Sequence, residues 1–189
     1  MVGITIRKEL LAFIAIAIWF IVLLFKYFKK KKLNLKHEFF IFIVMIYVLW
    51  VVGITLFPID ITWVKEYIPK RNVVISLNPF NLIEIFKLSG FKFIIINVLG
   101  NIALLIPSGI LISYKKKSFS YMDAFKIGLL ITISIEIMQG IEMYFSLAFG
   151  RSIDINDIIF NILGILIGKF IYDNLLINFI DKKLTHLNN

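Results

Sequence analysis

Carboxyl and amide side chains recur inside apolar stretches of this sequence, where a polar group is costly and its position is therefore informative. They stand in pairs three or four residues apart, so each pair would share one face of a helix. Such groups in an apolar setting can bind a polar ligand or transfer a proton. Together with a loop that follows the second pair, they form one set of candidate binding residues: Asn97, Asn101, Glu136, Gln139, Arg151, Asp154, Asp157 and Asn161.

Five apolar stretches must position these residues, and each is long enough, or nearly so, to cross about 30 Å of hydrocarbon as a helix. Hydrophobic residues make up 60% of the 189 residues, so lipid must be the solvent. We expect one all-α membrane domain over 1–189, with a short amphipathic interfacial helix that Asn81 and Glu84 would cap. The expected spans are 9–28, 39–57, 93–114, 124–145 and 155–176.

Lysine clusters predict how the chain is oriented. They lie at 29–32 with 36, at 115–117 and at 182–183, and five spans place all of them on one side. The positive-inside rule makes that side the cytoplasm, with the N-terminus outside and the C-terminus inside. Arg7 and Lys8 oppose this orientation but are outnumbered. We interpret the net charge of +9 as anchoring to anionic lipid, and we predict no nucleic-acid partner.

In this orientation the candidate residues of the last three spans lie in the outer half of the membrane, within about 13 Å of the outer helix ends. Three polar stripes at one depth predict a common pocket between these spans. We expect Arg151 to reach from the loop and pair with Glu136 or Asp157.

Small residues and a proline in the same spans bear on helix packing. Gly164 and Gly168 form a small-xxx-small pair, and Gly100 lies beside Asn101, so we expect all three glycines to favour close helix contact. Pro107 predicts a kink in the third span, because proline removes a helical hydrogen bond.

Four segments resemble motifs of the VanZ-like family, and together they cover roughly 71–172. The resemblance implies a multi-pass protein of the bacterial cell membrane that is associated with resistance to teicoplanin-type lipoglycopeptides. One element departs from the family pattern, because Asn78 directly precedes Pro79, and the role of Asn78 is left open. The segments are Ser76-Leu-Asn78-Pro79-Phe80, Asn97-Val-Leu-Gly-Asn101 with Pro107-Ser-Gly109, Ser134-Ile-Glu136-Ile-Met-Gln139, and Arg151-Ser-Ile-Asp154-Ile-Asn-Asp157 with Asn161 and Gly164.

The residue types present limit the chemistry that the candidate set can perform. The two histidines, His37 and His186, fall on the predicted cytoplasmic side, and the chain has no cysteine, so histidine-assisted or thiolate catalysis there is excluded. The carboxyl groups could supply oxygen ligands to Ca²⁺ or Mg²⁺, but Arg151 argues against added positive charge, and we predict neither a metal nor a cofactor. Transport ranks lower because the spans look apolar beyond Asn101, Glu136 and Asn161.

Two readings of the candidate set compete with a simple structural role in holding helices together. The leading hypothesis is a binding site for a membrane lipid, a lipid-linked cell-wall intermediate or an amphiphilic lipoglycopeptide. The alternative is an intramembrane enzyme that modifies a lipid or cell-wall precursor headgroup, with Glu136 as acid or base and Arg151 holding a phosphate.

The orientation is tested by cysteine accessibility, since the chain has no cysteine of its own. A cysteine at Ser152 should be labelled from outside intact cells, whereas a cysteine at Ser118 should be labelled only after the membrane is opened. Labelling of both positions from outside would refute the predicted orientation.

Overall fold

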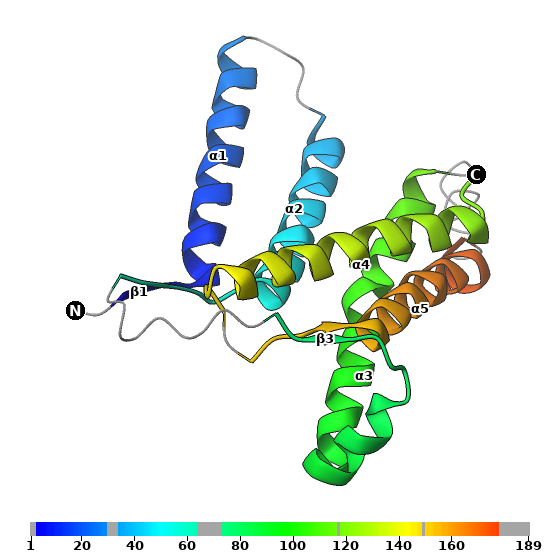
Figure 1. Cartoon of the computed structure of the whole chain (residues 1–189). Helices are drawn as coiled ribbons and strands as arrows, with labels where there is room; N and C mark the ends of the chain where they lie inside the picture. The colour runs from blue at the N-terminus through cyan, green and yellow to red at the C-terminus, as the bar shows by residue number, and fades with distance from the viewer. Residues whose placement is uncertain (1–2, 30–33, 64–72, 117, 149, 178–189) are drawn as a thin grey trace. The chain divides into compact units, whose positions relative to one another are not determined.

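The computed structural model of the protein describes residues 3–29, 34–63, 73–116, 118–148 and 150–177. In this part of the chain five helices are long and apolar enough to cross a membrane, which confirms the predicted polytopic all-α class. These segments are α1 (Lys8–Phe28), α2 (Leu35–Thr55), the Gly90–Lys115 part of α3 (Asn81–Lys115), α4 (Tyr121–Tyr144), and α5 (Ile155–Ile171) continued by a π-helical turn over Tyr172–Leu176 (Figure 1).

Part of the charge pattern behind the predicted orientation lies outside the described residues, namely the lysines at 30–32, 117 and 182–183, together with His186. The sidedness of the termini therefore stays a prediction.

Four short strands were not expected from the sequence. β1 (Gly3–Ile6) pairs antiparallel with β2 (Ile59–Thr62), and β3 (Ile75–Ser76) pairs in parallel with β4 (Ile153–Asp154). Each pair satisfies backbone polar groups where the chain enters or leaves a helix. Strands this short carry too little alternation to be recognised from sequence.

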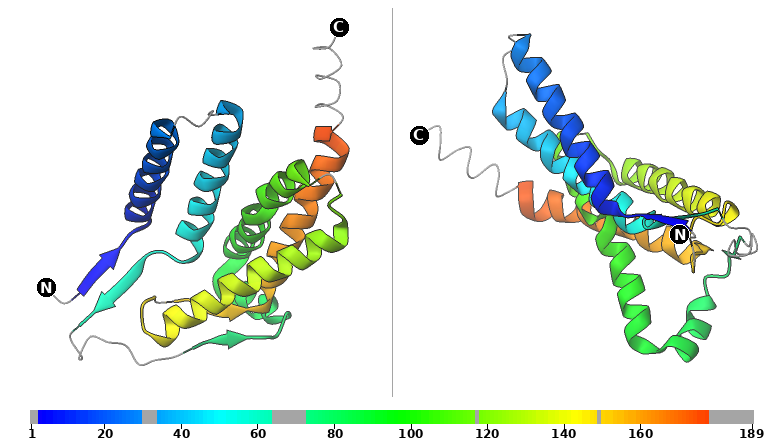
Figure 2. Two further views of the ribbon diagram at one scale, coloured as in Figure 1. Left: turned by 90° about the horizontal axis from the view of Figure 1, so that it is seen from above. Right: turned by 90° about the vertical axis from the view of Figure 1, so that its left-hand side faces the viewer.

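The chain divides into two compact units. The hairpin unit comprises the described residues of 1–73 and 138–151, and the bundle unit comprises those of 74–137 and 152–189. In the hairpin unit α1 and α2 form an antiparallel pair (Figure 2). The rings of Trp19 and Phe42 lie 4.8 Å apart, and Lys26 pairs with Glu38 at 2.8 Å, so both aromatic and ionic contacts join the two helices.

In the bundle unit the backbones of α3 and α5 touch. A Cβ on Gly164 would collide with the carbonyl oxygen of Ile102, and one on Gly168 would collide with that of Ile106. The expectation that this glycine pair lets helices approach closely is confirmed. Because both contacts advance by four residues in the same direction, α3 and α5 run parallel. Ile165, on the same stretch of α5, is fully buried.

One expectation about α3 is wrong, and the predicted kink at Pro107 stays a prediction. A Cβ on Gly100 would meet no atom of the described residues within 4 Å, so this glycine does not serve close packing among them. The backbone departs from helical φ and ψ at Gly90, with φ of 78°, whereas Pro107 lies within continuous helix. A glycine tolerates that positive φ without strain, and proline can stay in a membrane helix when the freed carbonyl is satisfied nearby.

The break at Gly90 separates a short helix, residues 81–89, from the span that follows, which agrees with the expected short helix. Its start differs from the expected capping pair. Asn81 is the first helical residue, and its Nδ2 donates to Ser76 Oγ at 3.0 Å. Asn78, whose role was open, accepts a hydrogen bond from the Phe80 backbone N–H at 3.0 Å and so forms the turn into α3.

The α3–α5 contact yields a matched pair of substitutions. Gly164→Ala should lower the free energy of unfolding by about 1–3 kcal/mol, because the new methyl group forces two backbones apart. Gly100→Ala should leave it unchanged or raise it by up to about 1 kcal/mol, since alanine favours helix and meets open space. Thermal unfolding of both variants in detergent measures the difference. Equal effects would contradict the contact.

Candidate functional site

The start of α5 gathers several of the predicted residues. Asp154 is the N-cap of α5, a position where aspartate is favoured, and its side chain accepts a hydrogen bond from the Asn156 backbone N–H at 2.9 Å. The Asp154 backbone N–H donates in turn to Glu136 Oε2 at 2.9 Å. Glu136 is buried, with 3% of its surface exposed. A carboxyl group of α4 therefore anchors the first turn of α5.

A second contact joins α3 to α5 at the same end. Asn101 Nδ2 donates to Asp157 Oδ1, and both side chains are half-buried. Asn97, one helical turn earlier on α3, is exposed. The predicted pairing of polar faces on the third and fifth spans thus occurs through Asn101 and Asp157.

Asn161 lies deeper in the bundle unit, with 2% of its surface exposed. Its Nδ2 donates to Thr132 Oγ1 at 3.1 Å, whereas its Oδ1 has no hydrogen-bond partner in the part of the chain that the structure describes. Thr132 was not among the residues predicted from the sequence. Its position four residues before Glu136, on the same face of α4, is the signal that could have identified it.

We call Asn101, Glu136, Asp154, Asp157 and Asn161 the acceptor group. Within the described part of the bundle unit, none of its three carboxyl groups has a basic partner. Their partners are amides and a backbone N–H, and further carboxyl oxygens remain to accept hydrogen bonds. Among all described residues, no three or more His, Asp or Glu side chains are placed to hold a metal ion. The chemistry of the acceptor group suits hydroxyl or amine donors.

The other two predicted residues make their contacts within the hairpin unit. Gln139 Nε2 donates to the Thr55 carbonyl at 2.9 Å, and Arg151 Nη2 donates to the Phe57 carbonyl at 3.2 Å. The guanidinium Nε of Arg151 lies 3.5 Å from Glu142 Oε2. The ion pair that the structure gives Arg151 is therefore with Glu142, a residue that sequence analysis did not include.

The turn after α4 explains why Arg151 pairs with Glu142. The Leu147 backbone N–H donates to the Glu142 carbonyl, and the Asp60 backbone N–H donates to the Leu147 carbonyl, both at 2.7 Å. These bonds fold the chain back along the end of α4 and hold it against β2. Arg151 therefore returns to the level of Glu142, which follows Gln139 by three residues on the same helix face.

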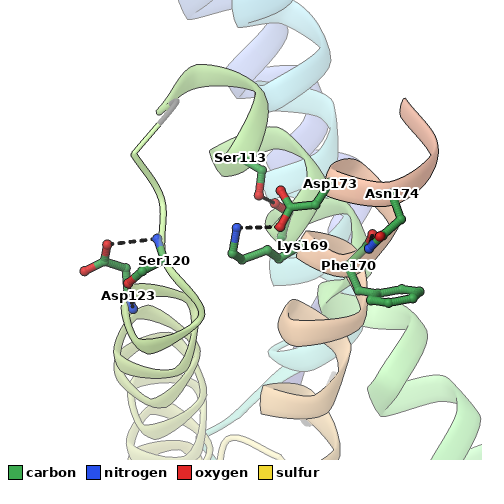
Figure 3. Close-up of polar contacts among 8 residues, drawn as sticks. Ser113, Ser120, Asp123, Lys169, Phe170, Asp173 and Asn174 are labelled. Carbon is green, nitrogen blue, oxygen red and sulfur yellow. Dashed lines mark hydrogen bonds and ion pairs between the residues drawn. The ribbon is translucent and has the colours of Figure 1, made fainter. Parts of the chain in front are cut away.

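Polar residues also occupy the opposite end of the bundle unit, where the sequence looked apolar. Lys169 is 6% exposed and forms an ion pair with Asp173 (Figure 3). Its Nζ lies 2.8 Å from Asp173 Oδ2 and 4.8 Å from the centre of the Tyr121 ring. Ser120 and Asp123 cap the start of α4, because the backbone N–H of each donates to the side-chain oxygen of the other (Figure 3). The expectation that the last three spans are apolar beyond the candidate residues is thus wrong, because the long Lys169 stem reaches polar partners from inside an apolar helix.

Comparison with known proteins agrees with the geometry. A family model described as VanZ/LLP1 matches residues 39–177, a range that begins in α2 and contains every candidate residue. No curated protein and no solved structure matches the chain. The match confirms the resemblance that the four motif segments indicated.

The Arg151–Glu142 pair can be tested by a double-mutant cycle. Arg151→Gln or Glu142→Gln alone should lower the free energy of unfolding, because each leaves a poorly solvated charge without its partner. The double variant should lose less than the sum of the two, with a coupling of about 0.5–3 kcal/mol. Equilibrium unfolding of the four proteins in detergent gives the coupling. Strict additivity would show that the two side chains do not interact.

Proposed function

Because the chain belongs to the VanZ/LLP1 family and is a membrane protein, we propose that its acceptor group binds the polar head of an amphiphile. The amphiphile would be a membrane lipid, a lipid-linked cell-wall intermediate or a lipoglycopeptide. In this proposal the protein contributes to resistance to teicoplanin-type lipoglycopeptides and lies in the bacterial cell membrane.

The observation that carries the proposal is the surplus of hydrogen-bond acceptors on buried and half-buried side chains. Glu136, Asp154 and Asp157 lack a basic partner within the described part of their unit, and the buried Asn161 Oδ1 lacks a hydrogen bond in the described chain. Buried polar groups in native proteins are normally paired, so the Asn161 Oδ1 without a hydrogen bond and the carboxyl groups without a basic partner among the described residues favour a ligand that supplies donors. Sugar hydroxyls and amines are such donors, and glycosylated amphiphiles carry hydroxyls.

A purely structural role accounts for only part of the acceptor group. One carboxyl oxygen of Glu136 anchors α5, and one of Asp157 binds Asn101. Within the described part of the unit, these bonds leave the second oxygen of each group to interact with a ligand. Helix attachment alone would be satisfied by fewer acceptors.

The surroundings of the acceptor group favour a ligand that also has an apolar chain. Ile159, Leu163 and Ile167 follow one another at intervals of four residues along α5, and each is 38–40% exposed. They begin just after the first turn of α5, so they form an apolar stripe that leads away from the polar residues. A headgroup at the start of α5 and an acyl chain along this stripe would suit an amphiphile.

The proposal is tested in a lipoglycopeptide-sensitive bacterial host. Glu136→Gln and Asp157→Asn should each return the minimal inhibitory concentration of teicoplanin to the empty-vector value. Each amide keeps the shape and one acceptor oxygen of the residue it replaces, so the Asp154 and Asn101 hydrogen bonds survive while the charge is lost. Lys126→Gln, a change of one charge at an exposed position on α4, should protect like the wild type.

Membrane abundance and thermal unfolding are measured in parallel. Full protection by both carboxyl variants would refute the proposal, and failure of both to accumulate would favour a structural role. Incubation of the purified protein with a lipid-linked precursor, followed by mass spectrometry, separates binding from catalysis, because only an enzyme changes the precursor mass.

A further inference from the structure

The hairpin unit contains a cleft of about 530 Å³ at the end where α1 begins and α2 ends. This volume lies within the range of roughly 300–1,000 Å³ that small-molecule sites occupy. We call it the cationic cleft. The residues of its lining that bear on its chemistry are Arg7, Lys8, Glu9, Gly53, Phe57 and Pro58.

The lining of the cationic cleft contains two positively charged residues and one negatively charged residue. Arg7 and Lys8 are exposed, and neither takes part in an ion pair among the described residues. These are also the two charges that oppose the orientation predicted from the lysine clusters. In the predicted orientation the positive-inside rule gives these two residues no anchoring role, and cations without an ion pair point to an anionic ligand.

Both walls of the cleft are fixed by other contacts of the hairpin unit. On one side, Thr5 Oγ1 donates to Asp60 Oδ1 at 2.6 Å within the β1–β2 pair, which sets the segment that leads into Arg7. On the other side, Arg151 holds the Phe57 carbonyl at 3.2 Å. The cleft is therefore a preformed feature of this unit.

The stem of Lys8 packs on a glycine of α2. A Cβ placed on Gly53 would lie 3.1 Å from the Lys8 Cβ and 3.4 Å from its Cδ. The absence of a side chain at Gly53 leaves room for the Lys8 stem and keeps the cleft open. A larger residue there would fill the cleft without changing any charge.

We propose that the cationic cleft binds a phosphate-bearing anion, with the phosphate of a lipid headgroup as its natural source. A planar guanidinium and a compact ammonium together complement phosphate oxygens. The first turn of α1 starts between them and adds a favourable dipole for an anion. The cleft lies at the ends of two membrane-length helices, where headgroups are found.

The proposal is independent of the acceptor group and of the family assignment. The cleft belongs to the hairpin unit, and Arg7 and Lys8 precede the matched range of 39–177. Its ligand chemistry is also the opposite, since the cleft offers cations and the acceptor group offers carboxyl oxygens.

Binding is measured on the purified full-length protein in a neutral detergent, by native mass spectrometry and thermal shift. Phosphatidylglycerol should bind, whereas diacylglycerol with the same chains and no phosphate should not. Arg7→Gln with Lys8→Gln should weaken phosphatidylglycerol binding about tenfold or more, because two charge-assisted contacts are lost. The matched control, Lys87→Gln with Lys92→Gln, removes the same charge at exposed positions of α3 and should change binding less than twofold.

Two further variants keep the test decisive if the double variant does not fold. Glu9→Gln should strengthen binding about twofold or more by removing the one negative charge of the lining, and Gly53→Leu should abolish binding by filling the cleft. Competition by inorganic phosphate distinguishes a free phosphate ligand from a lipid headgroup. If inorganic phosphate displaces phosphatidylglycerol, the free anion suffices for binding. If it does not, the lipid is required, and both outcomes support a phosphate site. Equal binding of diacylglycerol, an equal loss in the control, or no gain in Glu9→Gln would overturn the proposal.

Discussion

Close contact between the backbones of α3 and α5 is the constraint on which the bundle unit depends. Lipid offers no hydrophobic drive to bring two apolar helices together, so direct packing of small residues must hold them. Gly109 meets Ile165, and eight residues earlier on both helices Asn101 meets Asp157. Eight residues are about two helical turns, so the glycine contact and the polar contact share one register. Loss of the glycine contact would therefore displace the hydrogen bond between Asn101 and Asp157.

A second constraint acts at the helix ends, because their backbone N–H and C=O groups need hydrogen-bond partners that lipid cannot supply. At the start of α5 the partners are Asp154 and Glu136, and at the end of α2 the partners of the chain include Gln139 and Arg151. In the bundle unit the same carboxyl groups that complete the start of α5 belong to the acceptor group, whereas the cations of the cleft are Arg7 and Lys8. Carboxyl groups dominate in the bundle unit, and cations line the cleft of the hairpin unit.

The predicted partner of Arg151 shows why part of the site could not be read from the sequence. Spacing on a helix identified Glu136 and Gln139 as one face, yet Glu142 continues that face and is the residue that Arg151 contacts. The choice depends on the turn formed through Leu147, which two backbone hydrogen bonds define. Backbone hydrogen bonds do not depend on side-chain type, so no pattern of residues in the sequence predicts them.

The sequence by itself determined the five membrane-length helices, the family, and the pairing of polar faces on α3 and α5, because apolar length and helical spacing are local properties. Only the tertiary structure decided which neighbour each polar side chain meets. It assigned Asn78 to the turn before α3, paired β3 with β4, and left Gly100 facing open space while Gly164 touches Ile102. Those outcomes depend on helix rotation and loop path, which are set by contacts between residues far apart in the chain.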